Sequence, residues 1–312
     1  MEVLRDYALT SESAGLDSFW LPEHLLPVHG YYSFLADDWV LEPLEALAYV
    51  AAITERMLLG TAVALAPFRH PLMWAKMVAS LQFLAQGRLI LGLGTAWSPE
   101  EFDVLGIPRS ERGQRTDESI DVLLKAFDGQ PFDHDGRIFN FKGATINPVC
   151  DPRPRIWGSG GQGIAEYQLV GTRTISSKVV DRLARLDGWL TRPTANVEQM
   201  VAEYKVVQDT AARNGRDPSE IVLGHVNFCH LVDGSREGAL MEQKEWFARA
   251  LGPAVTFERV QALHWTGTLD DIADQVQRRL DAGVDHVVVH PLKPTTDQVH
   301  LWSDGVVKRL RS

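Results

Sequence analysis

Three short stretches of the chain carry side chains that could do chemistry, and the first is at His24. This histidine directly follows an apolar run at residues 18–22, with Glu23 beside it. A neutral imidazole at a strand end can hydrogen-bond a cofactor ring, or act as an acid or base near neutral pH. A purely structural histidine is the alternative. A cofactor-free enzyme would need a carboxylate pair here, for which Glu23 and Asp37 or Asp38 are the candidates.

The second stretch is a glycine loop after the apolar run RLILGL. Gly92 and Gly94 would bring backbone within reach of a ligand, and Thr95, Trp97 and Ser98 then offer two hydroxyls and an indole. In an α/β barrel the carboxyl ends of the strands carry the chemistry, so this loop is a candidate site. An ordinary junction between strand and loop would have the same spacing.

The third stretch is the glycine-rich turn formed by Gly158, Ser159, Gly160 and Gly161. Successive amides in such a turn can bind an anion, and late strands of a barrel often bind phosphate. A flexible linker is the alternative interpretation.

The usual signatures of metal and nucleophile chemistry are absent from the sequence. It contains no HExxH motif and no G-x-S-x-G motif, and we predict no metal site. His225 and His230 lie on one predicted strand, but their odd spacing places them on opposite faces. Cys150 and Cys229 have no zinc-ligand spacing. These absences favour a bound organic cofactor.

The charge and composition narrow the class of partner. The 312 residues carry a formal net charge of −10, which disfavours binding to nucleic acid because phosphates require a basic surface. No apolar run approaches the roughly 20 residues of a membrane span, and no leader sequence opens the chain. We therefore expect a cytoplasmic protein that binds neither nucleic acid nor membrane.

Short apolar strands alternate with amphipathic helices along the chain, a pattern typical of a parallel sheet with helical crossovers. The predicted strands contain Trp20, Val63, Leu91, Ile156, Trp189, Val226 and Val288. A closed (β/α)8 barrel needs an eighth strand, which would precede a helix predicted at residues 2–14. We therefore expect a TIM-like barrel whose first strand is missing, with an open seam. A doubly wound open sheet is the alternative, disfavoured because no G-x-G-x-x-G follows an early strand.

Two segments interrupt this repeating pattern. Residues 129–148 contain Asp-Gly between two alternating runs, which predicts a β-hairpin insertion. The polar segment at residues 162–178 is a possible lid that orders when a cofactor binds. Otherwise residues 1–312 form one predicted domain. Exposed aromatic residues at Tyr31, Tyr32 and Phe34 would fit a homodimer contact.

Several segments together resemble the bacterial luciferase-like superfamily of flavin and deazaflavin oxidoreductases. They are SAGLDSFWLPEHLLP, TERMLLGTAVALAPFRHP, AKMVASLQFLAQGRLILGLGTAWSPEEFDVLG, ERGQRTDESIDVLLKAF and TGTLDDIADQVQRRLDAGVDHVVV. The resemblance implies a TIM-like barrel with insertions that binds FMN or coenzyme F420 at the strand ends. The histidine of its PEH-like motif, here His24, would lie near the reactive edge of the ring.

The resemblance also assigns roles to the other candidate residues. It implies a non-prolyl cis peptide bond between Ala62 and Val63, under the ring. Gly94 and Thr95 would line the cofactor, and residues 158–161 would bind its phosphate. Trp20 or Trp97 would stack near the ring.

This sequence departs from the family in two further respects. Residues 162–178 are longer than the corresponding segment of most members. The sugar-phosphate dehydrogenases of the family have a glutamate near Trp97 and a tryptophan near Val28, and neither is matched here. We therefore do not expect a sugar-phosphate substrate.

The predicted function is hydride transfer between coenzyme F420 and a small organic substrate. One alternative is an FMN-dependent monooxygenase that uses O2 and reduced flavin from a partner flavin reductase. A non-catalytic homologue that lacks the first strand is the other.

Overall fold

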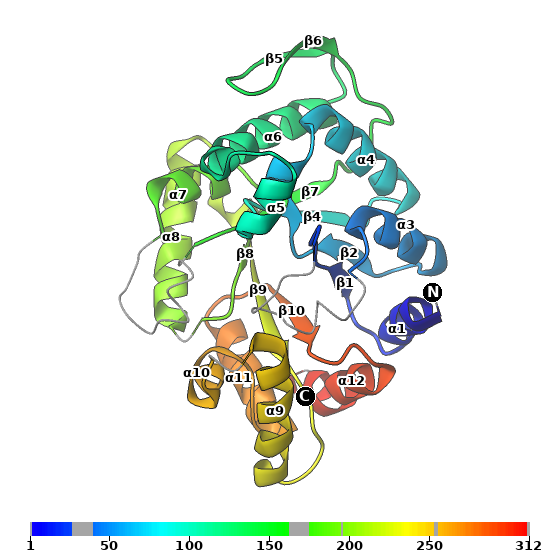
Figure 1. Cartoon of the computed structure of the whole chain (residues 1–312), viewed down its shortest axis with the longest axis vertical. Coiled ribbons are helices and arrows are strands. Elements are labelled where there is room, and N and C mark those ends of the chain that lie inside the picture. Colours follow the sequence, from blue (N-terminus) through cyan, green and yellow to red (C-terminus); the bar gives the residue numbers. More distant parts are fainter. Residues whose placement is uncertain (1, 27–39, 162–174, 195, 253–254, 311–312) are drawn as a thin grey trace. The chain divides into compact units, whose positions relative to one another are not determined.

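The computed structural model of the chain describes residues 2–26, 40–161, 175–194, 196–252 and 255–310 (Figure 1). These residues form two compact units. The first unit contains residues 17–26 and 40–157, and the second contains residues 2–16 and the described residues from 158 onwards. The predicted dimer contact at residues 31–34 and most of the predicted lid lie outside the described residues.

Parallel strands form the sheet of the first unit. They are β1 (Ser18–Leu21), β2 (Leu58–Thr61), β3 (Ala64–Leu65), β4 (Leu89–Gly94) and the beginning of β7 (Arg155–Ser159). Strand β2 pairs with both β1 and β4, and β3 also pairs with β4. Every residue of β4 is buried, as predicted for a parallel strand that is covered on both faces. The single strand predicted around Val63 is divided into β2 and β3.

Three helices of the first unit begin with the same kind of N-terminal cap. α3 (Pro43–Ile53), α4 (Pro71–Leu84) and α5 (Pro99–Val104) each start with proline, whose missing N–H is not needed there. The side chain of the residue before each proline accepts a backbone N–H of the first turn. The remaining helices of this unit are η1 (Ala66–Phe68), η2 (Arg109–Glu111) and α6 (Arg112–Phe127).

The predicted hairpin is present and is anchored on α6. β5 (Phe132–Asp135) and β6 (Asn140–Ala144) pair in antiparallel fashion, and Figure 1 shows them beside α6. The carboxylate of Glu118 accepts the backbone N–H groups of Arg137, Ile138 and Phe139 at 2.9–3.2 Å. Burial opposes ionisation, but these hydrogen bonds stabilise the carboxylate and lower the pKa of Glu118.

The second unit contains three further parallel strands with their helices. β9 (Val222–Cys229) pairs with β8 (Gly188–Thr191) and with β10 (His286–Pro291). The longer helices are α1 (Glu2–Ser13), α8 (Val197–Arg213), α9 (Arg236–Leu251) and α11 (Leu269–Asp281). The short ones are α7 (Ser177–Leu183), η4 (Pro218–Glu220), α10 (Phe257–Leu263) and α12 (Thr296–His300). The Ser303 hydroxyl donates to the carbonyl oxygen of Ala14 at 2.8 Å, which connects the residues after α12 to the end of α1.

The last helical residues of the second unit do not form one regular helix. Residues 296–310 are divided into α12, a π-helical segment η5 (Leu301–Val307) and α13 (Lys308–Leu310). Within η5, a Cβ on Gly305 would lie 2.6 Å from the Leu269 side chain, so α11 packs against this backbone. Helix α10 was not predicted. Among the helices of the described segments, none has the length and apolar character needed to cross a membrane.

Candidate active site

His24 lies just beyond the end of β1, and its imidazole is held by a carboxylate. Its Nδ1 atom is 3.2 Å from Oε1 of Glu101, and the Trp97 indole forms a T-shaped contact with the ring, with centroids 5.9 Å apart. The His24 side chain is 10% exposed. The structure therefore brings together two of the predicted site residues, His24 and Trp97, in the first unit.

Glu101 is a residue of this site that the sequence analysis did not identify. It lies in the first turn of α5, where the Ser98 hydroxyl accepts its backbone N–H. A serine followed three residues later by glutamate indicates a capping box, in which the glutamate side chain returns to the serine backbone. Here the Glu101 carboxylate instead accepts the N–H groups of Leu25 and Leu26, at 2.7 and 3.3 Å, beside His24.

Glu23 has a structural role in this arrangement. Its Oε2 accepts the N–H of Leu65 at 2.7 Å, and its Oε1 is 2.6 Å from the Arg69 guanidinium. Arg69 also pairs with Glu42 at 2.6 Å. Burial opposes the charge of Arg69, but the hydrogen bonds and ion pairs with the two glutamates prevail and raise its pKa. The sequence analysis missed Arg69, which directly follows the short helix η1 after β3.

The peptide bond between Ala62 and Val63 is cis, as the resemblance predicted. The glycines of β4 make room for this bulge. A Cβ atom on Gly94 would lie 2.7 Å from the Val63 side chain, and one on Gly92 would lie 2.0 Å from the carbonyl oxygen of Thr61. Gly92 thus accommodates the neighbouring backbone. That Ala62, Val63, Gly94 and Thr95 contact a cofactor stays a prediction.

Trp20 fills space within the sheet of the first unit. Its Nε1 donates to the Ser18 hydroxyl at 2.7 Å, and its ring lies 5.5 Å from that of Trp157. A Cβ on Gly60 would lie 2.2 Å from this ring, so only a glycine at position 60 leaves enough space for the indole. Stacking of Trp20 or Trp97 on a cofactor is untested.

The glycine-rich turn at the end of β7 belongs to the second unit from Gly158 onwards. The Trp189 indole donates to the carbonyl oxygen of Gly160 at 2.9 Å, and Gly161 has a φ of 118°. Beside this turn, Glu203 contributes with Gly160 and Trp189 to a cavity of about 10 Å³, the size of one water molecule. Burial raises the pKa of Glu203 although two hydrogen bonds oppose this.

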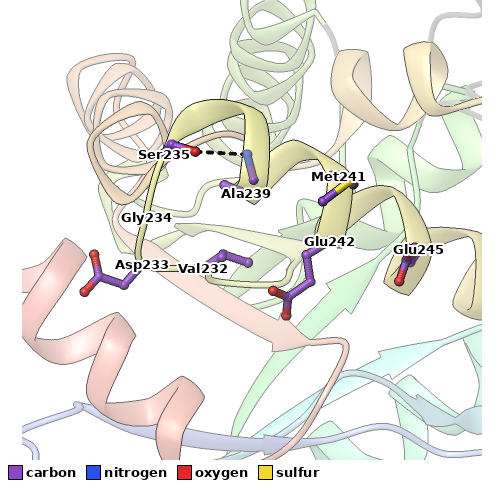
Figure 2. A pocket seen from close by; sticks show the side chains of 9 residues that line it. Val232, Asp233, Gly234, Ser235, Ala239, Met241, Glu242 and Glu245 are labelled. Atoms are coloured by element: carbon purple, nitrogen blue, oxygen red, sulfur yellow. Dashed lines mark hydrogen bonds between the residues drawn. The ribbon is translucent and has the colours of Figure 1, made fainter.

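A larger cavity of about 390 Å³ lies elsewhere in the second unit, between residues 232–235 and α9 (Figure 2). Three carboxylates contribute to its lining, from Asp233, Glu242 and Glu245. Glu242 is 2.7 Å from the buried His230 imidazole. None of the predicted site residues lines this cavity. Within the described segments, no group of three or more His, Cys, Asp or Glu side chains is placed to hold a metal ion.

Comparison with known sequences identifies relatives along most of the chain. The model of the family described as luciferase-like monooxygenase matches residues 2–286. An F420-dependent glucose-6-phosphate dehydrogenase of Nakamurella multipartita is 26% identical over 99% of this chain and 92% of its own length. An uncharacterised protein of Mycobacterium tuberculosis is 29% identical over 67% of this chain and 74% of its own length.

Solved structures of the same fold cover nearly the whole chain. Monooxygenase RslO1 from Streptomyces bottropensis has a TM-score of 0.81 and 22% identity, covering 99% of this chain and 93% of its own. An F420-dependent secondary alcohol dehydrogenase in complex with an F420–acetone adduct has a TM-score of 0.80 and 17% identity, covering 99% and 94%. The predicted TIM-like α/β fold is therefore confirmed.

Proposed function

Because the chain belongs to the luciferase-like monooxygenase family, we propose that it transfers hydride between coenzyme F420 and a small organic substrate. The observation that carries this proposal is the His24 imidazole, which Glu101 holds through Nδ1 at the end of β1. We propose that the other ring nitrogen, Nε2, is the one that serves the reacting group. Members of this family are enzymes that use F420 or FMN, and relatives named for F420 match this chain over 99% of its length.

The residues present fit such a cofactor on two observations. The His24 imidazole, held through Nδ1 by Glu101, can orient or protonate a reacting group through its other nitrogen. In the second unit, the positive φ angles of Gly160 and Gly161 allow successive amides to face one anion, and Trp189 fixes the turn. We propose that residues 158–161 bind the cofactor phosphate, and that Gly94, Thr95 and Trp97 lie at the ring. When bound, F420 would supply a carbon centre that gives or accepts the hydride.

A second function is favoured by other neighbours. An FMN-dependent monooxygenase would use O2 and reduced flavin from a partner reductase, and an EDTA monooxygenase from Chelativorans has a TM-score of 0.82 with 15% identity, covering 99% of this chain and 86% of its own. We do not propose a sugar-phosphate substrate. The carboxylate beside His24 among the described residues is that of Glu101. It accepts hydrogen bonds from the Leu25 and Leu26 amides, so we assign it no contact with a substrate.

The test is calorimetric titration of the protein with F420 and with FMN, each oxidised and reduced. His24→Ala is the variant, and His300→Ala, an exposed histidine of α12, is the matched control. We expect binding of F420 by all three proteins, and loss of turnover with small alcohols in His24→Ala alone. Binding of reduced FMN alone would favour the monooxygenase. Binding of neither cofactor would contradict both functions.

A further inference from the structure

We propose that Glu101 is a positioning residue that holds the His24 imidazole in the tautomer with its proton on Nδ1, so that Nε2 is the nitrogen offered to the reacting group. The sequence pattern predicts a capping role for Glu101, whereas its carboxylate lies beside the chain that follows β1. The catalytic meaning of the tautomer rests on the proposed function. The tautomer itself does not.

The hydrogen bonds around one oxygen determine the direction of the His24 contact. Oε1 of Glu101 accepts the N–H groups of Leu25 and Leu26, so it is oriented as an acceptor. A carboxylate oxygen that accepts two amides cannot also donate to an imidazole nitrogen. The 3.2 Å contact is therefore a hydrogen bond donated by Nδ1–H of His24.

The surroundings of Glu101 make this arrangement rigid. Glu101 is fully buried, and its Oε2 has no hydrogen-bond partner among the described residues. The two amides also hold the carboxylate independently of the imidazole. Trp97 packs edge-on against the His24 ring at an interplanar angle of 82°, which restricts a ring flip.

The consequence for chemistry is a defined proton acceptor. With Nδ1 protonated, the lone pair of a neutral imidazole is on Nε2. When a substrate hydroxyl gives its proton to Nε2, the positive charge on the ring is balanced by the buried carboxylate 3.2 Å from Nδ1. In the reverse direction the same nitrogen returns the proton.

The experiment measures the tautomer by nitrogen NMR of histidine-labelled protein without cofactor, at alkaline pH. The His24 signals are assigned by their absence from His24→Ala. We expect a protonated Nδ1 and an unprotonated Nε2 in the wild type, and a mixture of tautomers in Glu101→Ala, because that variant lacks the oxygen that accepts Nδ1–H. Glu100→Ala, at the exposed neighbour, is the matched control and should retain the wild-type signals. An Nε2–H tautomer in the wild type would overturn the proposal even if Glu101→Ala failed to fold.

A second measurement separates this inference from the proposed function. In the enzyme loaded with the cofactor that it binds, we expect Glu101→Ala to lower kcat by about 10-fold or more while the cofactor Kd is unchanged. A Glu101→Ala protein with wild-type tautomer and kcat would refute the positioning role. If the tautomer is as expected but neither cofactor binds, the proposed function fails and the His24 geometry stands.

Discussion

Gly92 is the residue at which β4 accommodates the bulge of its neighbour. The Thr61 hydroxyl donates to the carbonyl oxygen of Gly92 at 2.7 Å, and the backbone of Thr61 occupies the space where a side chain at position 92 would begin. Because that neighbouring atom is backbone, it cannot move aside as a flexible side chain could. Thr61 directly precedes the cis bond that the family resemblance predicted.

We therefore predict that Gly92→Ala lowers the free energy of unfolding by about 3 kcal/mol, the upper end of the usual cost of overpacking. Urea denaturation followed by circular dichroism measures the change. Gly238→Ala in α9 is the matched control, since its Cβ would meet a serine hydroxyl at 3.3 Å, and we expect a change of about 1 kcal/mol or less. Equal effects of the two substitutions would refute this explanation for Gly92.

At the scale of elements, β1 is clamped at its end by charged side chains. Glu23 connects the end of β1 to β3 through the N–H of Leu65, and Arg69 connects Glu23 to Glu42 at the start of α3. Arg69 is 15% exposed at its side chain, so its ion pairs are largely shielded from water. Removing the guanidinium would leave two carboxylates close together without their shared partner.

We predict that Arg69→Ala costs about 3 kcal/mol of stability, as expected when one partner of a buried ion pair is removed. Arg115→Ala is the control. Arg115 pairs with Glu111, which lies one helical turn away and has a side chain that is 39% exposed. We expect this substitution to cost about 1 kcal/mol of stability or less. Urea denaturation measures both. If Arg69→Ala is no more destabilising than the control, the clamp is unimportant. In a double-mutant cycle, Glu42→Gln should lose most of its own effect once Arg69 is absent.

Elements with a strong pattern could be predicted from the sequence, and short or irregular ones could not. Six of the predicted strands are present and the one predicted around Val63 is divided into β2 and β3, because an apolar run bounded by turn residues suffices to recognise a buried strand. Helix α5 was missed because it has only six residues, too few for a periodic face. Glu101 was missed for a related reason, since its local spacing indicates a cap whereas its partner is 77 residues away.

At the scale of the whole molecule, the second unit depends on buried histidines that stay neutral. His225 is fully buried between the Thr191 hydroxyl at 2.9 Å and the Arg279 guanidinium, which donates to its Nε2 at 3.2 Å. A proton on Nε2 would displace this hydrogen bond and face a positive charge. Burial, together with Arg279 and His264, lowers the pKa of His225 to about 3. Burial alone lowers that of His264 to about 3.

The consequence is a loss of stability in mild acid. The unfolded chain protonates these histidines near pH 6.5, whereas the folded chain does so only near pH 3, so the unfolded state binds more protons between these values. The contribution of these histidines to the free energy of unfolding is therefore fully present above pH 6.5 and is lost as the pH decreases. At pH 5 the loss is about 2 kcal/mol for each histidine.

We predict that His225→Gln reduces the difference in unfolding free energy between pH 7 and pH 5 by about 2 kcal/mol. Urea denaturation at the two pH values gives this difference for each protein. Any loss of stability through lost packing is common to both pH values and cancels in the comparison. His300→Gln, on the exposed face of α12, should leave the difference unchanged. If the unfolding free energy of His225→Gln differs between pH 7 and pH 5 by as much as that of the wild type, the acid sensitivity arises from other groups.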